Sequence, residues 1–127
     1  MKITANNPDR KSWLKVDKNS DFPIQNIPFG VFLTKDDITT IGTRIGKYAI
    51  DLAAFHQLGY FEGIPLTDDM FMQDSLNDFI SDGRTTWRLV RNRIAKVFDD
   101  KNPKLKENKA HKDKIIFNVK EVECCYL

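Results

Sequence analysis

Short apolar runs rich in β-branched residues occupy the first third of the chain and predict strands. The stretch "WLKV" (residues 13–16) follows a polar start and is expected to form a short strand. "FGVFLT" (residues 29–34) and "ITTIGTRI" (residues 38–45) favour two longer strands. "GK" (residues 46–47) then supplies a two-residue loop with glycine first, which is typical of a type II′ turn. We therefore expect a hairpin over residues 39–51.

Apolar residues recur at helical spacing in three later segments. Residues 51–59 have one apolar face and end in Gly59, which predicts a short helix. Residues 74–83 begin with a capping pattern around Ser75 and predict a second helix. Residues 84–100 form the longest expected helix. The buried faces of these helices should consist of Leu52, Phe55, Leu58, Leu76, Phe79, Ile80, Trp87, Val90, Ile94, Val97 and Phe98.

The remaining segments carry weaker patterns. Residues 60–73 contain glycine and proline breakers and should be irregular. Residues 101–114 are rich in lysine and poor in apolar side chains, which predicts a mobile loop. "IIFNV" (residues 115–119) predicts a further strand. The expected fold class is α+β: a small β-barrel or curled antiparallel sheet with two or three added helices, as one domain over residues 1–127.

Charge and cysteine content narrow the classes of function. The 127 residues include 20 basic and 18 acidic side chains, and a net charge of +2 gives little support for a nucleic-acid partner. Cys124 and Cys125 are adjacent, so a bond between them would be strained, and reduced thiols in a cytoplasmic protein are the simpler interpretation. Glu121 and Glu123 disfavour a reactive thiolate. The opening residues lack the apolar core of a signal peptide, and no membrane span is expected.

One helix carries candidate binding chemistry. Arg84, Arg88 and Arg91 line one side of the helix expected over residues 84–100. Such a face can bind phosphate or nucleic acid. The segment before it is acidic, with Asp68, Asp69, Asp74, Asp78 and Asp82. Attraction between these two segments is therefore the favoured interpretation, and a nucleic-acid partner is not expected.

The other candidates lack the partners that their chemistry requires. Neither His56 nor His111 has a recognisable nucleophile or orienting group in the sequence. The acidic pairs at residues 36–37 and 68–69 are expected to cap turns. Aromatic residues could line a peptide groove, although core packing is favoured for Trp13, Phe22, Phe29, Phe32 and Tyr48. No residue is therefore assigned a catalytic, substrate-binding or metal-binding role, and no cofactor is expected in this chain.

The stretch "SDFPIQNIPFGVF" (residues 20–32) is the most distinctive part of the sequence. Pro23 and Pro28 fix the backbone in a path that suits neither a helix nor a central strand. The stretch closely resembles the signature near the N-terminus of the fumarylacetoacetase family, S-D-F-P followed by N-[LI]-P-[YF]-G-[VI]-F. Residues 41–55 and 74–94 resemble two further family segments in the same order. The matching positions of the last segment are Leu76, Asn77, Phe79, Gly83, Trp87 and Arg91.

This resemblance implies a fold and a function. The family's N-terminal domain resembles an SH3-like barrel with added helices. Members of the family hydrolyse a carbon–carbon bond of 4-fumarylacetoacetate, which gives fumarate and acetoacetate in tyrosine and phenylalanine catabolism. They use Ca²⁺ or Mg²⁺ with a Glu–His pair that activates water, and they are usually homodimers. The segments that carry these groups have no counterpart here, so we expect the catalytic domain to be absent from this chain.

Two interpretations from different classes follow. The leading one is a non-catalytic N-terminal domain of a fumarylacetoacetase, a scaffold for a catalytic domain of the same polypeptide. Its signature stretch should pack Phe22, Ile24 or Ile27 on the sheet and present the other residues to that domain. The alternative is a stand-alone small-barrel module for protein interaction. A large exposed apolar patch would favour the first interpretation, and a concave aromatic groove with a polar rim would favour the second.

Overall fold

The computed structural model describes residues 11–14, 27–33, 39–67, 69–72, 77–81, 83–121 and 123–126. The elements are β1 (Phe29–Leu33), β2 (Thr39–Ile45), β3 (Tyr48–Asp51), α1 (Leu52–Gln57), α2 (Asn77–Ser81), α3 (Arg84–Phe98), α4 (Pro103–Lys106), α5 (Lys109–Ile115), β4 (Ile116–Asn118), the 3₁₀ turn η1 (Val119–Glu121) and β5 (Glu123–Tyr126). These elements place the described part of the chain in the α+β class, as the sequence predicts.

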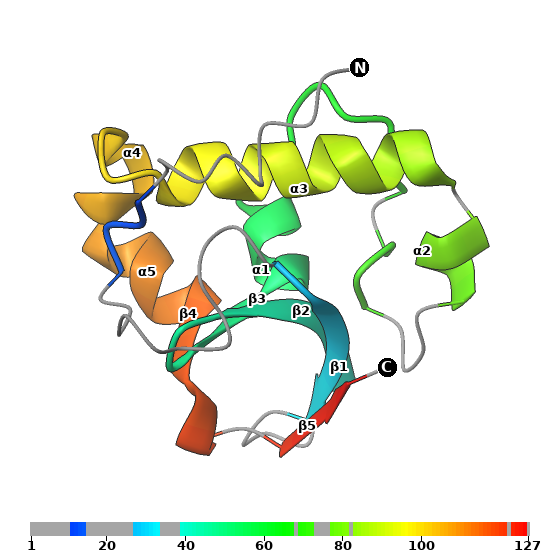
Figure 1. The fold of residues 1–127 in the computed structure, drawn as a ribbon, viewed down its shortest axis with the longest axis horizontal. Helices are drawn as coiled ribbons and strands as arrows, with labels where there is room; N and C mark the ends of the chain where they lie inside the picture. Colours follow the sequence, from blue (N-terminus) through cyan, green and yellow to red (C-terminus); the bar gives the residue numbers. More distant parts are fainter. Residues whose placement is uncertain are drawn as a thin grey trace.

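The five strands form one antiparallel sheet in the order β4-β3-β2-β1-β5. The sheet is strongly curled, as Figure 1 shows, but it stays open. Its edges are β4 and β5, which are connected by η1. β1, β2 and β4 lie where the sequence predicted strands, so the expected curled sheet is confirmed. β5 was not expected.

The β2–β3 hairpin and its turn are confirmed. Ile45 pairs with Tyr48, which leaves a two-residue loop between the strands. A type II′ turn requires a positive φ at its first central residue and a negative φ at its second. Gly46 has a φ of 59°, and Lys47 is not among the described residues with positive φ.

Gly42 on β2 lies where there is no room for a side chain. A methyl group built on it would overlap the Phe32 ring and the Ile50 carbonyl oxygen.

Asp51 connects the sheet to the helices. It is the last residue of β3 and the N-cap of α1, where its side chain accepts hydrogen bonds from the backbone of Ala53 and Ala54. Thr40 Oγ1 on β2 donates to the same Asp51 oxygen at 2.8 Å. Burial raises the pKa of Asp51 above its usual 3.8, although these hydrogen bonds act in the opposite direction. The chain therefore turns from strand to helix at a carboxyl group held largely out of water.

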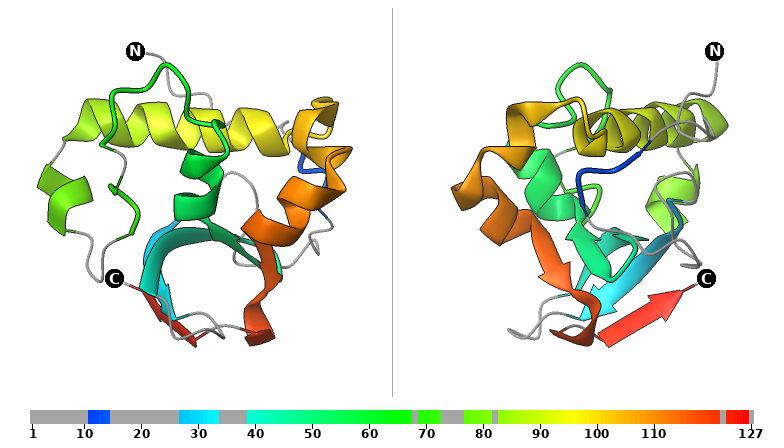
Figure 2. Two further views of the ribbon diagram at one scale, coloured as in Figure 1. Left: turned by 180° about the vertical axis from the view of Figure 1, so that it is seen from behind. Right: turned by 60° about the vertical axis from the view of Figure 1, so that its left-hand side comes forward.

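The five helices of the described residues all lie between β3 and β4 in the chain. Figures 1 and 2 show α1 standing on the sheet and α3 running across the side of α1 that faces away from it. The predicted apolar stripe of α3 is buried, apart from the half-buried Trp87. Sheet, α1 and α3 thus enclose one core whose fully buried members include Ile41, Ile45, Ile50, Leu52, Phe55, Val90, Ile94 and Phe98.

The irregular segment after α1 contributes more to this core than its sequence predicts. Phe55 of α1 contacts Tyr60 and Phe61, with ring centroids 5.0 and 4.6 Å apart. Phe61 contacts Phe71 in turn, at 5.3 Å. The backbone of Ile41 donates to the Phe71 carbonyl oxygen at 2.8 Å, which ties the segment to β2. Aromatic packing and this bond hold an irregular path in place of regular secondary structure.

The prediction of a mobile loop over residues 101–114 is wrong, because this segment forms α4 and α5. Asn102 caps α4, with Pro103 as the first helical residue, and Asn108 caps α5. Leu105 is fully buried in the common core. Two capped turns and one apolar anchor therefore order a segment whose lysine content suggested a loop.

Two smaller expectations also need correction. Trp13 and Leu14 are not in a strand; Ser12 makes only an isolated bridge to Asp99, and residues 15–16 lie outside the described residues. Trp13 instead stacks on Phe98 at 5.2 Å. Ile80 is 47% exposed, not buried, because α2 is a short helix that buries Phe79 alone among its described side chains.

Candidate functional site

The described part of the signature stretch begins with a buried residue in an unusual conformation. Ile27 is completely buried in the core and has a φ of 39°. A β-branched residue with positive φ is strained, and such strain persists only where the surrounding structure fixes the backbone. The expectation that Ile27 packs on the domain is confirmed, whereas Phe22 and Ile24 lie outside the described residues. The surrounding core therefore fixes the backbone of the signature at Ile27.

Phe29 links this signature to α2 and α3. Its ring meets Phe79 of α2 edge to face, with centroids 4.8 Å apart. The guanidinium of Arg91 on α3 lies 4.9 Å from the Phe29 ring centroid, as a cation–π pair. Trp87 Nε1 donates to the Phe79 carbonyl oxygen at 2.7 Å. The start of β1, α2 and the first half of α3 are thus joined by four side chains that all belong to the family-like segments.

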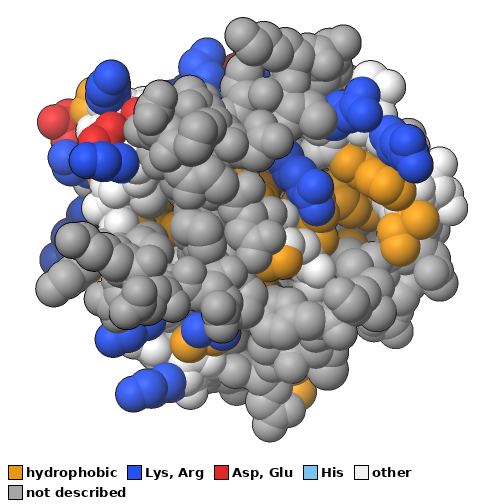
Figure 3. All heavy atoms as spheres, in the orientation of Figure 1, with side chains coloured by type: hydrophobic (Ala, Val, Ile, Leu, Met, Phe, Trp, Pro, Cys, Tyr) orange, Lys and Arg blue, Asp and Glu red, His pale blue; other side chains and the backbone are white. Residues whose placement is uncertain are grey.

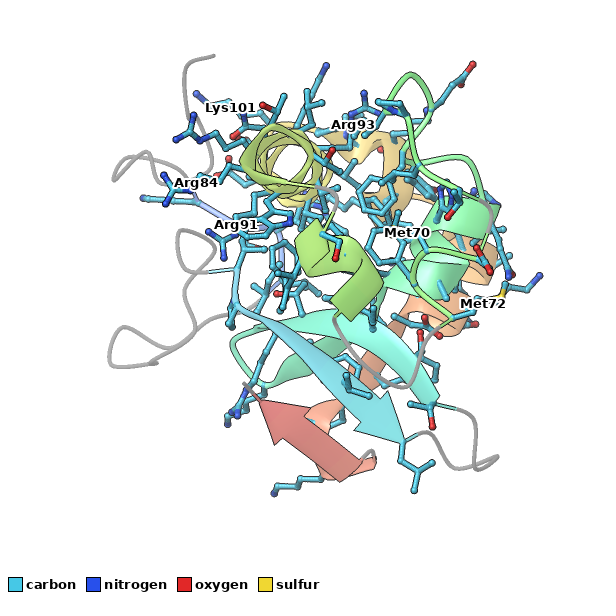
Figure 4. The ribbon with its side chains drawn as sticks, turned by 90° about the vertical axis from the view of Figure 1, so that its right-hand side faces the viewer. Met70, Met72, Arg84, Arg91, Arg93 and Lys101 are labelled. Carbon is cyan, nitrogen blue, oxygen red and sulfur yellow. The ribbon has the colours of Figure 1, made fainter. Side chains whose placement is uncertain are left out.

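A shallow hollow of about 250 Å³ lies beside this contact on α3. Its lining side chains are spaced so that they share one helix face, and we call it the Arg–Trp hollow: Arg84, Trp87, Arg88 and Arg91. Figure 3 shows Lys and Arg side chains around an exposed hydrophobic area where α3 begins, and Figure 4 shows Arg84 and Arg91 on the same side of the ribbon, above β1. Partial burial lowers the pKa of the Arg91 guanidinium.

The sequence identified these three arginines but assigned Trp87 to the buried helix face. The missed signal was the spacing. Trp87 lies three residues after Arg84 and four before Arg91, so its side chain is on the arginine face at the border with the apolar stripe. The predicted pairing of the basic helix with an acidic segment stays a prediction. Among the five aspartates of that segment, only Asp69 has a described side chain.

Arg93 does not belong to this face. Its Nη1 donates to the carbonyl oxygens of Tyr60 and Glu62, both at 2.8 Å. These bonds fix the turn after α1 against α3. A second hollow of about 260 Å³ opens between this turn, α3 and Lys104, but the guanidinium on its wall is already engaged. Arg93 is therefore a structural residue.

The two histidines join segments of the fold. His56 Nε2 lies 3.0 Å from the Thr67 carbonyl oxygen. His111 Nδ1 lies 2.8 Å from the Tyr60 hydroxyl oxygen and 3.0 Å from Asn108 Nδ2. His111 thus connects α5 to the irregular segment. In the described residues both rings contact structural groups, which agrees with the interpretation made from the sequence.

The remaining candidates are not brought together. Trp13 packs at the end of α3 on Phe98, whereas Phe29 packs on α2, and Phe32 is buried in the sheet. These described aromatic residues pack in different parts of the domain, as the favoured interpretation expected, and do not line a common groove. The side chains of Cys124 and Cys125 lie outside the described set, as do residues 36–37.

Two kinds of feature are absent from the described ranges. No three His, Cys, Asp or Glu side chains in these ranges gather as metal ligands do. Within the same ranges, no helix combines the length and the apolar character needed to cross a membrane. The described surface does offer a cationic and aromatic face at the Arg–Trp hollow, and such a face can bind anionic groups.

The fold and this surface define an α+β domain with a curled antiparallel sheet, helices inserted between β3 and β4, and a basic face on α3. The model of the fumarylacetoacetase N-terminal family matches residues 25–126. The chain belongs to this family.

Individual relatives agree with this assignment. The fumarylacetoacetases of Dictyostelium discoideum and Arabidopsis thaliana are 34% and 35% identical to the chain, over 88% and 89% of its length. The fumarylacetoacetase of Caenorhabditis elegans is 41% identical over 77% of the chain. These alignments cover only 26%, 27% and 24% of the three relatives. The chain therefore spans about a quarter of the length of the curated relatives that it matches.

Proposed function

We propose that this chain is the non-catalytic N-terminal domain of a fumarylacetoacetase and serves as a structural scaffold for a catalytic domain in the same polypeptide. The observation that carries this proposal is the family match over residues 25–126, in a chain that spans a quarter of its relatives. The name shared by these relatives supports fumarylacetoacetate hydrolysis as the activity of the full-length protein.

The chemistry of the whole enzyme is part of the same proposal. It would split 4-fumarylacetoacetate into fumarate and acetoacetate, in tyrosine and phenylalanine catabolism, as a cytoplasmic homodimer. A Ca²⁺ or Mg²⁺ ion would require several converging oxygen ligands. In the described residues no three His, Cys, Asp or Glu side chains gather as the ligands of such an ion would. We therefore assign neither a metal ligand nor a catalytic step to a residue of this chain.

We further propose that the sheet is a variant of the SH3-like barrel. The support is the strand order β4-β3-β2-β1-β5, in which a single 3₁₀ turn separates the last two strands and the last strand returns to β1. Five antiparallel strands joined in this way are the plan of SH3-like barrels. The helices then represent one long insertion between β3 and β4.

The scaffold role has a physical rationale in the signature. A strained Ile27 and the bridge between Phe29, Phe79 and Arg91 hold the start of β1 rigidly against two helices. A rigid segment can orient a neighbouring domain without paying an ordering cost when the two dock. Pre-organisation of the catalytic domain is thus a function that this segment can perform without reactive groups.

The test compares this chain with the full-length protein encoded by the same gene. Both are assayed for loss of the fumarylacetoacetate absorbance, with Ca²⁺ or Mg²⁺ present and after chelation. We expect hydrolysis by the full-length protein with a divalent cation and none by the 127-residue chain. A full-length protein that lacks hydrolase activity would refute the proposal. In that case the alternative, a protein-interaction module, becomes the leading interpretation.

A further inference from the structure

The Arg–Trp hollow gathers three guanidinium groups on one face of α3. Arg84 and Arg91 are seven residues apart on α3, which places their Cα atoms roughly 10 Å apart along the helix, with Arg88 between them. The N-cap of α3 is Gly83, which offers no side-chain acceptor to the helix N-terminus. The positive end of the helix therefore adds to the field of the three guanidiniums.

The composition of the hollow favours a protein partner. Tryptophan and arginine are the residue types that most often dominate binding energy in protein interfaces. Each guanidinium can hold one carboxylate through two parallel hydrogen bonds, and the Trp87 side chain offers an apolar floor between them. A nucleic acid would draw on a larger excess of positive charge than the net +2 of the whole chain. The fitting occupant is therefore a peptide segment with several Asp or Glu side chains.

The topology shows where such a segment would come from. β5 pairs with β1, and its residue Tyr126 stands opposite Gly30, next to Phe29. Phe29 in turn carries the Arg91 guanidinium on its ring. In Figure 1 β5 accordingly lies beside β1, and β1 lies on the side of the molecule where α3 begins. A polypeptide that continues from β5 starts close to the Arg–Trp hollow.

We propose that the Arg–Trp hollow is the docking site for an acidic segment of the polypeptide that continues beyond residue 127. This inference rests on the proposed function, since the occupant belongs to the catalytic part of the same enzyme. Docking neutralises the three arginines and fixes the catalytic domain relative to the signature through Arg91 and Phe29. The partner face is thus specified by charge as well as by shape.

Arginine footprinting tests the docking directly. Phenylglyoxal, an arginine-selective reagent, is applied to the 127-residue chain and to the full-length enzyme, and modification rates are read by mass spectrometry. Carboxylate pairing should slow the modification of Arg84, Arg88 and Arg91 in the full-length enzyme about tenfold. About 1 M salt should restore much of the rate, because it screens exposed charge pairs. Arg93, bonded to two carbonyl oxygens, is the internal control and should react slowly in both proteins.

A charge-reversed variant gives a second readout. Arg84→Glu combined with Arg88→Glu should lower the melting temperature of the full-length enzyme more than that of the 127-residue chain. Any attraction to the acidic residues of the chain itself is lost in both proteins, so the additional loss in the full-length enzyme reports the lost partner. Lys101→Glu combined with Lys109→Glu, at exposed positions elsewhere, is the matched control and should leave both proteins unchanged.

Fumarylacetoacetate hydrolysis, measured in the same samples, separates the two proposals. Active full-length enzyme with protected arginines supports both. Active enzyme with arginines that react equally fast in both proteins overturns the docking and leaves the proposed function standing. Protection without hydrolysis supports the docking and overturns the proposed function, and absence of both overturns both. Protection that appears only after an oligonucleotide is added would identify a nucleic-acid surface and overturn the docking.

Discussion

Asp51 offers a prediction in which two opposing effects can be separated. Its Oδ1 accepts hydrogen bonds from Thr40 Oγ1, Ala53 N and Ala54 N at 2.8, 2.9 and 3.2 Å. Burial nevertheless raises the pKa of this carboxyl group. The hydrogen bonds therefore stabilise the fold through the acceptor oxygen, whereas burial of the negative charge destabilises it. Asp51→Ala removes both the acceptor and the charge, whereas Asp51→Asn keeps an acceptor oxygen and removes only the charge.

The expected magnitudes follow from these contacts. Loss of the N-cap should lower the free energy of unfolding by about 1 kcal/mol. Loss of the charged acceptor of Thr40 should add about 1 kcal/mol, because the hydroxyl oxygen keeps a contact of 3.2 Å to the Phe71 carbonyl oxygen. Asp51→Ala should therefore cost about 2 kcal/mol, or about 8 °C in melting temperature. Asp51→Asn should cost less than about 1 kcal/mol, because asparagine is also a good N-cap.

The raised pKa gives this prediction a sign with respect to pH. The folded protein binds the Asp51 proton more tightly than the unfolded chain, whose pKa lies near 3.8. The stability that protonated Asp51 contributes is fully present below 3.8 and is lost as the pH rises through the folded-state pKa. The stability of the wild type relative to Asp51→Asn should therefore be lowest at pH 7 and rise as the pH falls toward 4.

Urea unfolding followed by tryptophan fluorescence at pH 7 and pH 4.5 measures these differences. Asp113→Asn, at an exposed position on α5, is the control for a carboxyl group in water. The reasoning is refuted if Asp51→Ala costs less than about 0.5 kcal/mol, the usual effect of a surface substitution. It is also refuted if the difference between the wild type and Asp51→Asn does not change with pH.

Three further substitutions test the fold by chemical denaturation. Gly42→Ala should lower the free energy of unfolding by about 3 kcal/mol or more, because its methyl group would overlap Phe32 and the Ile50 carbonyl oxygen. Near-wild-type stability would contradict that close approach. Leu105→Ala should cost about 2–5 kcal/mol while Lys106→Ala costs little; equal effects would argue against α4 as part of the core. Gly46→Ala should cost at least about 1 kcal/mol because φ is 59°, and a neutral result would exclude the type II′ turn.

The elements that the sequence predicted correctly have their determinants close together in the chain. The hairpin at 39–51 depends on β-branched runs on either side of a glycine-first turn. α3 depends on an apolar stripe that repeats over four turns. In both cases the local pattern and the tertiary environment favour the same structure, so the pattern was sufficient.

The failures have long-range causes. In residues 101–114 the caps Asn102 and Asn108 were visible, but the lysine content outweighed them because one apolar residue, Leu105, gave no periodic pattern. Phe71 is tied to β2 by the hydrogen bond from Ile41, 30 residues earlier in the chain, and Phe61 packs on Phe55 and Phe71 within a segment that has no regular structure. Such contacts leave no local pattern from which burial can be predicted.

The candidate surface was predicted in part. The arginine face of α3 was visible from helical spacing alone, since 84, 88 and 91 fall on one side of any helix that spans them. The role of Arg91 beside Phe29 was not visible, because it depends on how β1 and α3 cross. The fixed position of Ile27 was foreseen only as one of three packing possibilities, and its positive φ was not foreseen.

The position of the helices within the sheet order sets the sequence of events in folding. β2 and β3 are joined by two residues, whereas every described helix lies between β3 and β4, and β1 meets β5 across almost the whole chain. Closing a long loop costs entropy that a short hairpin does not. We therefore expect assembly to proceed outward from the hairpin. During synthesis β1 remains an unpaired edge until β5 has left the ribosome, so the interval before that moment is when the domain is most exposed to mispairing.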